Sequence, residues 1–247
     1  MSIKNVTLTA IPSIPLINKG DDIGEIICSV FKTQKILIND GDVLVIASKI
    51  FTKAEGKLVS LKEIIPSDLA KEISAISGKD PRIVELMLKE STILEVKPGV
   101  VVTRHRLGFE CTSAGIDRAN TGNPSDELVS LLPNDPDQSA RKVSDTIFQE
   151  MGKRVGVVIN DSFGINGRYG SIGLAIGLAN MPGLIEQSGR KDLYGKSRNV
   201  KISFVDEIAA AGSLLMGQAD DALPVVLIHG LLYEPQNGKL SDVVANN

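Results

Sequence analysis

Residues 158–177 read VINDSFGINGRYGSIGLAIG and continue the apolar run RVGVVI at 154–159, which predicts a buried β-strand. Glycines follow at 164, 167, 170, 173 and 177, and a glycine backbone can approach a ligand closely because no side chain intervenes. Asp161 stands at the predicted end of the strand, where burying a carboxylate is costly unless it meets a cation or hydrogen-bond donors. The stretch therefore predicts a glycine loop that holds something charged. The alternative is a tight turn followed by a crowded strand.

Outward from this stretch, hydrophobic periodicity and turn residues predict a mixed α/β protein. Further strands are expected at 6–11, 42–48, 92–96, 99–105, 109–113, 200–205 and 224–230. Helices are expected after Asp21 or Asp22, from Ser67 to Gly78, from Asp80-Pro81 through about Glu90, from Asn134-Asp135-Pro136 to Met151, and from Val205 to Met216. Strands and helices do not alternate regularly, so a Rossmann fold is not expected.

The chain is expected to form one domain over residues 1–247. A loop at 121–137, rich in Asn, Asp, Pro and Gly, is a candidate boundary between two subdomains. The final stretch, from about Glu234, is polar and is expected to be frayed.

Composition excludes several classes of function. The chain has 247 residues and a formal charge of −3, which gives no general attraction to nucleic acid or to an anionic membrane. No apolar run reaches the length of a membrane span and no secretory leader opens the chain, so we expect a cytoplasmic protein.

The two cysteines, Cys28 and Cys111, are too few for a disulfide framework or a zinc cluster and are expected to be reduced, buried thiols. The two histidines are His105 and His229, and a structural role is favoured for each. Any metal would therefore be held mainly by oxygen ligands, which suits magnesium, calcium or manganese.

Four further segments carry residues of the types that bind phosphate or metal. Each has an alternative reading as a turn, a polar loop or a solvated surface. No P-loop motif is present, and no GxGxxG spacing follows the strand at 154–159. Together, however, the segments supply the oxygen ligands, cations and backbone donors of a phosphoryl-transfer site. Their polar residues are Ser48, Lys49 and Lys53; Asp117 and Asn120; Arg190, Lys191, Lys196 and Arg198; and Gln218, Asp220 and Asp221.

In their order along the chain, seven blocks resemble the coenzyme F420:L-glutamate ligase family (F420-0:gamma-glutamyl ligase). They span about residues 14 to 224 and read IPLINKGDD, DVLVIASKIFTKAEGK, AGIDRAN, RVGVVINDSFG, GLAIG, GRKDLYGK and DEIAAAGSLLMGQADDALP. The resemblance implies that family's own α/β fold, with two subdomains that intertwine in a homodimer.

The activity that the resemblance implies is a GTP-dependent amide ligation. In the family, GTP phosphorylates a carboxylate on the phospholactyl tail of a deazaflavin, the F420 precursor, and the amine of L-glutamate attacks the acyl phosphate. The implied cofactors are two divalent cations, Mg²⁺ or Mn²⁺, with K⁺ as a further candidate. These cations would neutralise the phosphates and the charge that develops during transfer.

Residue roles carry over by motif. The implied metal positions are Asp117, Asp161, Ser162 and Gln218. The implied nucleotide positions are Ile14, Pro15, Leu16, Ile17, Ser48, Lys49, Lys53, Asn120, Met216, Gly217, Gln218, Ala219, Asp220, Asp221, Ala222 and Leu223. Asp161 and Arg168 are the expected catalytic residues. Arg190, Lys191 and Tyr194 fall in a family motif, and their binding of the acidic substrate is our hypothesis.

Three positions depart from the family pattern. Ser162 stands where threonine is usual, and Gln218 stands where an acid can occur. The family loop G-R-x-x-R-x-G reads GINGRYG here, so that Ile165 replaces the first arginine and Arg168 remains. Arg104, Arg106 and Arg118 are the candidates to compensate.

The change at residue 165 motivates one alternative, an amide ligase of the same fold with a different acidic acceptor. The other alternative is a non-catalytic protein that binds a nucleotide or a deazaflavin.

Overall fold

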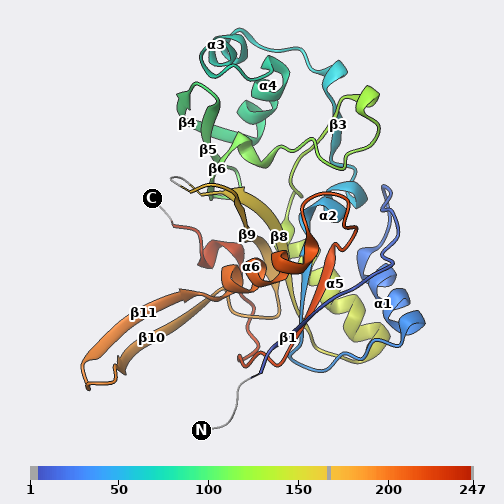
Figure 1. Ribbon diagram of the computed structural model, residues 1–247, viewed down its shortest axis with the longest axis vertical. Helices are drawn as coiled ribbons and strands as arrows, with labels where there is room; N and C mark the ends of the chain where they lie inside the picture. The colour runs from blue at the N-terminus through green and yellow to red at the C-terminus, as the bar shows by residue number, and fades with distance from the viewer. Residues whose placement is uncertain (1–4, 166–167, 246–247) are drawn as a thin grey trace.

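A five-stranded mixed sheet forms the centre of the molecule (Figure 1). The computed structural model describes residues 5–165 and 168–245. In spatial order the strands are β1 (Thr7–Ala10), β12 (Val225–His229), β2 (Val43–Ala47), β8 (Gly156–Gly164) and β9 (Ser171–Ala179). β2 and β8 run parallel, and the other three neighbouring pairs are antiparallel. The expected mixed α/β class is confirmed, and this order is not that of a Rossmann sheet.

Helices cover both faces of this sheet because its strands are apolar on both sides. They are α1 (Ile23–Gln34) and α5 (Pro136–Met151) on one face and α6 (Phe204–Met216) on the other. Successive side chains of a strand point to opposite faces. Accordingly, Val157 and Ile159 pack with α1 and α5, whereas Val158 packs with α6.

A second group of elements, at the top of Figure 1, has its own apolar clusters. Helices α3 (Asp68–Ser77) and α4 (Pro81–Glu90) begin after Ser67 and Asp80, whose side chains cap them as the sequence predicts. They pack near a three-stranded sheet of β4 (Ser91–Lys97), β5 (Val100–His105) and β6 (Glu110–Thr112). This second group also contains the short strand pair of β3 (Leu58–Ser60) and β7 (Leu128–Ser130). Three turns complete the group: Leu61–Glu63, Ser113–Gly115 and Pro124–Asp126.

A hairpin of β10 (Leu184–Lys191) and β11 (Ser197–Ser203) extends away from the body, and we call residues 184–203 the arm (Figure 1). The sequence pattern predicts a strand at 200–205 but not β10. Residues 204 and 205 of that predicted strand instead begin α6.

Much of the predicted glycine loop is strand, so that prediction is wrong. β8 continues to Gly164, and Asp161 therefore lies inside a strand that pairs with β9. At Gly173 in β9, an added Cβ would lie 2.5 Å from Asn160 Oδ1 and 2.8 Å from Ala209 O, so any other residue type would force its neighbours to shift. The crowded-strand alternative is correct for this glycine. Residues 166 and 167 lie outside the described residues.

Two other expectations also need correction. The strand predicted at 42–48 ends at Ala47, and Ser48–Ala54 form helix α2, which periodicity did not reveal. The C-terminal stretch is packed rather than frayed, because Leu240 at the start of the turn Leu240–Asp242 is buried and its N–H donates to Asp137.

The structure also bears on the two cysteines and on membrane-spanning helices. Cys28 and Cys111 are buried and free, as expected. Among the described residues, no helix has the length and apolar character needed to cross a bilayer.

Candidate functional site

A cavity of about 380 Å³ lies at the edge of the central sheet where β2 ends and its parallel pairing with β8 stops, at Ala47 and Asn160. Parallel strands bring their carboxyl ends to one edge, which is where open α/β sheets bind ligands. The cavity is lined by the loop at 14–17 after β1, residues 47–50 with Lys53, residues 117, 119 and 120, β8 residues 160–162, and most of the loop at 216–224. Segments from the two ends and the middle of the chain therefore meet here.

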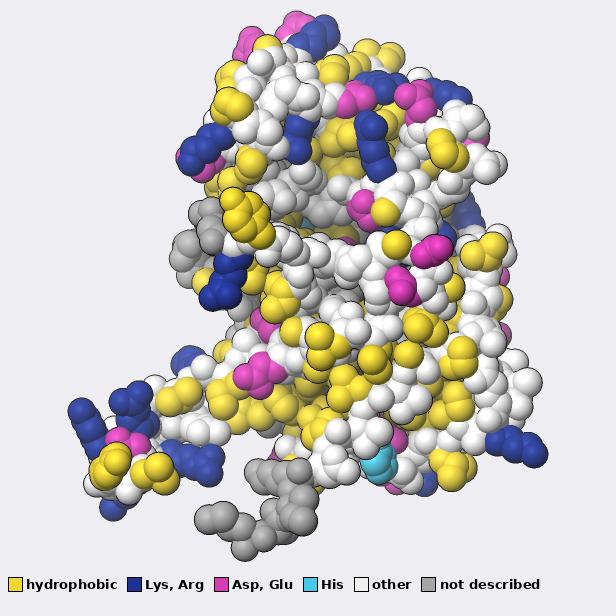
Figure 2. Space-filling view, in the orientation of Figure 1, with side chains coloured by type: hydrophobic (Ala, Val, Ile, Leu, Met, Phe, Trp, Pro, Cys, Tyr) yellow, Lys and Arg dark blue, Asp and Glu magenta, His cyan; other side chains and the backbone are white. Residues whose placement is uncertain are grey.

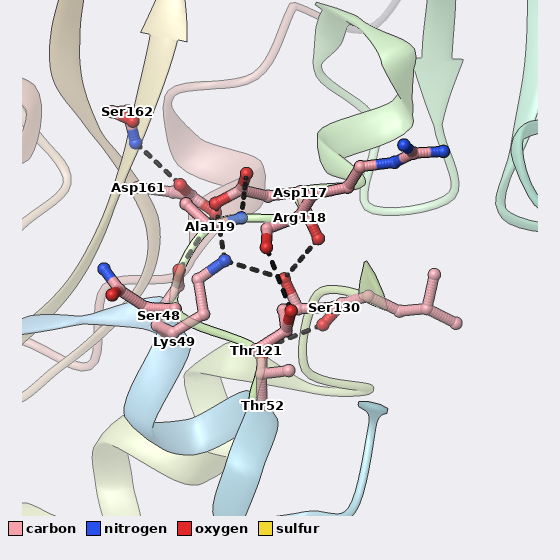
Figure 3. Close-up of polar contacts among 12 residues, drawn as sticks. Ser48, Lys49, Thr52, Asp117, Arg118, Ala119, Thr121, Ser130, Asp161 and Ser162 are labelled. Carbon is pink, nitrogen blue, oxygen red and sulfur yellow. Dashed lines mark hydrogen bonds and ion pairs between the residues drawn. The ribbon is translucent and has the colours of Figure 1, made fainter. Parts of the chain in front are cut away.

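Asp161 on β8 is one of the carboxylates in the cavity. Its Oδ2 accepts a hydrogen bond from Ser48 Oγ at 2.9 Å, and its Oδ1 accepts from the Ser162 N–H at 2.7 Å (Figure 3). Burial raises the pKa of Asp161 to about 6, against the lowering effect of these donors and of the Lys49 charge. A positive charge placed next to this carboxylate would stabilise its ionised form.

Asp117 is a second carboxylate. Its Oδ2 accepts from Lys49 Nζ at 2.5 Å, and its Oδ1 accepts from the Ala119 N–H at 2.9 Å (Figure 3). Burial opposes ionisation of Asp117, but these two partners hold its pKa below the ordinary value. A backbone bridge to Ser130 on β7 sets the position of Asp117.

Two lysines of α2 line the cavity. Lys49 Nζ also donates to Ser130 Oγ at 2.8 Å, which fixes the ammonium between β7 and Asp117. Lys53 lies one turn later on the same helical face. Its burial, together with the nearby Lys49 charge, lowers the pKa of Lys53. Two ammonium groups on one helical face are suited to contact the oxygens of a phosphate chain.

The loop at 216–224 closes the cavity and is held in a constrained shape. Gly217 ends α6 with φ 71°, and Asp221 folds back toward it and accepts from the Ala219 N–H at 3.3 Å. Asn120 Nδ2 donates to Ala219 O at 2.9 Å, which ties this loop to the segment that carries Asp117. Asn120 and Ala222 both adopt φ 55°. Such left-handed backbone at non-glycine residues often accompanies ligand sites.

The structure brings together most, but not all, of the residues that the sequence singled out. The four implied metal positions and all of the implied nucleotide positions except Asp221 line this cavity. Arg168 is exposed on the connection between β8 and β9, and Arg190, Lys191 and Tyr194 lie on the arm. None of these four lines the cavity of its own chain.

Sequence reasoning missed two residues that shape the site. Ser130, which holds Lys49, lies in a segment that was expected to be loop, and no local pattern indicates its role. Asn160 is buried and lines the cavity, and its Nδ2 donates to Ser213 Oγ at 3.0 Å. Its neighbour Asp161 was the signal that could have drawn attention to it.

The donor set fits a hydrated divalent cation. Asp117 and Asp161 offer carboxylate oxygens, Ser162 a hydroxyl and Gln218 an amide oxygen, which are the ligands that Mg²⁺ and Mn²⁺ prefer. Within 5–165 and 168–245, no group of three or more His, Cys, Asp and Glu side chains is placed to hold a metal. The chain's own donors therefore suit a cation that also takes oxygens from water or phosphate.

The three arginines that are candidates to compensate for Ile165 differ in their surroundings. Arg106 is occupied by Glu90 at 2.9 Å and by the Pro133 and Asn134 carbonyl groups. Arg118 pairs with Asp80 at 3.4 Å. Arg104 pairs with the exposed Glu110 at 2.9 Å and lines a second cavity, so of the three it is the one that faces a cavity.

Comparison with known proteins gives one consistent result. The sequence model of the F420-0:gamma-glutamyl ligase family matches residues 12–230. The chain is 41% identical over 227 residues to the coenzyme F420:L-glutamate ligase of Methanothermobacter thermautotrophicus, which covers 91% of this chain and 89% of that one. It is 41% identical over 228 residues to the protein of the same name from Methanopyrus kandleri, with 90% and 86% covered. For the Archaeoglobus fulgidus protein, identity is 40% over 227 residues, with 92% and 88% covered.

Proposed function

Because this chain belongs to the F420-0:gamma-glutamyl ligase family, we propose that it joins L-glutamate to the carboxylate of a coenzyme F420 precursor in a reaction driven by GTP. One observation carries the proposal: carboxylates and two lysines from distant segments converge on a single cavity. That arrangement suits a nucleoside triphosphate, because the lysines attract its phosphates and the carboxylates attract its cations.

The chemistry requires an activated acyl group, since a free carboxylate is a poor acylating agent. In the proposed reaction, the acceptor carboxylate takes the γ-phosphoryl group of GTP, and GDP leaves. The amine of L-glutamate then attacks the acyl carbon, a C–N bond forms, and the C–O bond to phosphate breaks. The amine loses a proton and inorganic phosphate departs, so the products are the amide, GDP and phosphate.

Lys49 and Lys53 would bind phosphate oxygens, and Asn120 and the loop at 216–223 would enclose the rest of the nucleotide. Asp117, Asp161, Ser162 and Gln218 would hold Mg²⁺ or Mn²⁺, which neutralises phosphate charge as the phosphoryl group is transferred. K⁺ is a further candidate cation. Lys49 contacts Asp117 directly, so cation binding at Asp117 would require this ammonium to move toward the phosphates.

Arg168 and the arm would contribute to binding of the anionic substrates. Arg190, Lys191 and Tyr194 lie far along a hairpin that leaves the body, and Figure 2 shows Lys and Arg side chains gathered at its free end. Leu193 and Tyr194 there are 99% and 96% exposed. An isolated two-stranded hairpin is marginally stable in water. We therefore propose a homodimer in which the arm of one copy packs against the other.

The alternative with a different acidic acceptor rests on a specific observation. Ile165 is 42% exposed at the end of β8, where the family carries an arginine. This alternative predicts normal GTP binding and no glutamylated F420 precursor. The non-catalytic alternative predicts nucleotide or deazaflavin binding without turnover.

The decisive experiment is a ligation assay read by mass spectrometry. The purified chain is incubated with GTP, Mg²⁺ or Mn²⁺, L-glutamate and the F420 precursor that lacks glutamate. We expect a product heavier by one glutamyl unit, dependent on both GTP and the metal. GTP binding without such a product, with either metal, would contradict the proposed acceptor. ATP in place of GTP and a reaction without metal are the controls.

A further inference from the structure

A second cavity, of about 360 Å³, lies at the free edge of β9. The turn between β5 and β6, the strands β8 and β9, the first turn of α6 and the C-terminal segment at 240–245 surround it. Its volume lies within the range of about 300–1,000 Å³ that is typical of small-molecule sites. The lining combines apolar and polar surface in similar amounts, and it carries the charged residues Arg104, Glu110 and Asp206.

Two of the walls are aromatic rings held in a fixed geometry. The Phe109 ring meets the Phe163 ring edge to face, with centroids 5.3 Å apart and planes at 67°. Phe109 also stacks on the buried His105 ring, with centroids 5.3 Å apart and planes at 14°. Rings locked in this way offer a flat aromatic ligand both edge and face contacts at little entropic cost.

The second cavity is close to the first because both use neighbouring residues of β8, Asn160–Ser162 in the first and Phe163 in the second. Phe163 lies two residues beyond Asp161 on β8, so the two side chains point to the same face of the sheet. Leu174 on β9 lines the second cavity and is paired in register with Asp161, which lines the first. Paired residues of an antiparallel ladder have Cα atoms about 4.5–5.5 Å apart. The two cavities therefore border neighbouring positions of the sheet, at Asp161 and Leu174.

We propose that this second cavity binds the aromatic ring system of the acceptor, a deazaflavin, and directs its carboxylate-bearing tail toward Asp161. The inference rests on the proposed function and extends it by assigning a subsite for the acceptor. Arg104 provides the positive charge for the anionic tail, because the other charged groups of the lining have partners: Asp206 accepts from the Ala175 N–H and Ser203 Oγ, and Glu110 pairs with Arg104 itself. Its ion pair with Glu110 is exposed and therefore weak, so this guanidinium is free to exchange partners.

The test uses the fluorescence of the deazaflavin in titrations against the whole chain. Two probes are compared: the F420 precursor without glutamate, and the deazaflavin nucleoside that lacks the phospholactyl tail. Phe163→Leu should weaken binding of both probes at least tenfold and leave the affinity for GTP unchanged. Arg104→Gln should weaken binding of the precursor about tenfold and that of the tail-free nucleoside less than twofold.

Phe148→Leu is the matched control, because it removes an aromatic ring from α5 at a place that lines neither cavity. Thermal unfolding of each variant shows whether it is folded. Arg104→Gln breaks only an exposed ion pair, so it keeps the test informative if the loss of the buried Phe163 ring unfolds the protein.

Two results would overturn the assignment, and they differ in what they mean for the proposed function. If the wild type ligates glutamate while Phe163→Leu and Arg104→Gln bind both probes as the wild type does, the acceptor binds elsewhere and the proposed function stands. If the wild type binds GTP but neither deazaflavin probe, both the subsite and the F420 acceptor are wrong.

Discussion

The cavity at the edge of the central sheet and the arm hold their polar side chains in opposite ways. In the cavity, Asp117, Lys49 and Ser130 bind one another although they come from separate segments. In the arm, Asp192 accepts from the Tyr194 and Lys196 N–H groups within its own turn. The cavity is thus pre-organised by contacts across the whole fold. The arm is ordered by local pairing, and its outer side chains would gain a fixed position only from another molecule.

The sharpest test of this difference compares one carboxylate from each region. Asp161→Asn should lower kcat/KM for glutamate ligation by about 10³-fold, because it removes a negative ligand for the cations that neutralise phosphate. Asp192→Asn in the arm keeps an oxygen acceptor in the turn and should change kcat/KM less than threefold. Steady-state ligation assays measure both. If the Asp161→Asn variant kept activity near that of the wild type, the proposed role of Asp161 in metal binding would be wrong.

The two regions should also differ in their response to pH, since residues 184–203 contain no histidine. Near the cavities, burial together with the Arg106 charge lowers the pKa of His105 to about 4, from 6.5 in the unfolded chain. Below pH 6.5 the unfolded chain therefore binds more protons than the folded protein. The stabilising contribution of about 3 kcal/mol is complete above pH 6.5 and is lost as the pH falls toward 4.

Chemical denaturation at several pH values measures this effect as the slope of the unfolding free energy against pH. His105→Asn should remove this contribution, so the difference in unfolding free energy between the wild type and this variant should change by about 3 kcal/mol between pH 6.5 and 4. The opposite contribution of Asp161, whose pKa is raised to about 6, is common to both proteins and cancels in the difference. His229→Gln is the matched control and keeps the His105 contribution. A His105→Asn protein with the wild-type pH dependence would contradict the assignment.

Lysines from the two regions give the next comparison. Lys49→Gln should lower kcat/KM and the affinity for GTP by about 10²-fold, since a fixed cation next to the phosphates is lost. Lys191→Gln on the arm should lower kcat/KM only a few-fold and leave GTP affinity unchanged. Calorimetric titration with GTP separates the two. Equal losses of GTP affinity would mean that the arm also contacts the nucleotide.

Crowding at the hairpin of β8 and β9 can be tested with two glycines. Gly173→Ala places a methyl group against Asn160 and the Ala209 carbonyl and should lower the unfolding free energy by about 2 kcal/mol. Gly164→Ala adds the same methyl group where nothing lies within 4 Å and should change it by less than about 0.5 kcal/mol. Urea denaturation of both variants makes the comparison. Equal stabilities would show that β9 can shift away from α6.

Mixed dimers test whether the arm of one copy acts at the cavity of the other. If the arm of one copy completes the cavity of the other, the double variant Arg190→Glu/Lys191→Glu should lose about tenfold in activity. Mixing it with Asp161→Asn and allowing subunits to exchange should restore about a quarter of the wild-type activity. The reason is that half of the dimers are then mixed and each has one intact site. A mixture no more active than its parents would mean that the arm serves its own chain or none.

Elements whose signals are local were predictable from the sequence. Asp80 followed by Pro81 marks the start of α4, and the run DVLVIA marks β2, because capping, fixed φ and apolar runs act over a few residues. β10 was missed because its sequence, LIEQSGRK, is mostly polar and is extended through its pairing with β11. Helix α2 was missed because it is short and follows a strand without a break.

The residues of the candidate site also fall into those with a local sequence signal and those without one. The position of a carboxylate after an apolar run is enough to single out Asp161, and the motif blocks indicate most of the other cavity residues. Ser130 and Arg104 carry no local signal, since each acquires its place through partners that belong to other elements.

The sequence alone determined the α/β class, the capped helices and the types of side chain available for phosphate and metal binding, because these follow from composition and from neighbours along the chain. The tertiary structure decided which of those side chains meet. Lys49 contacts Asp117 and Ser130 across separations of 68 and 81 residues, and Leu174 connects the two cavities through its register with Asp161. Such contacts depend on how strands pair and how faces pack, and these are fixed only when the whole chain buries its apolar surface.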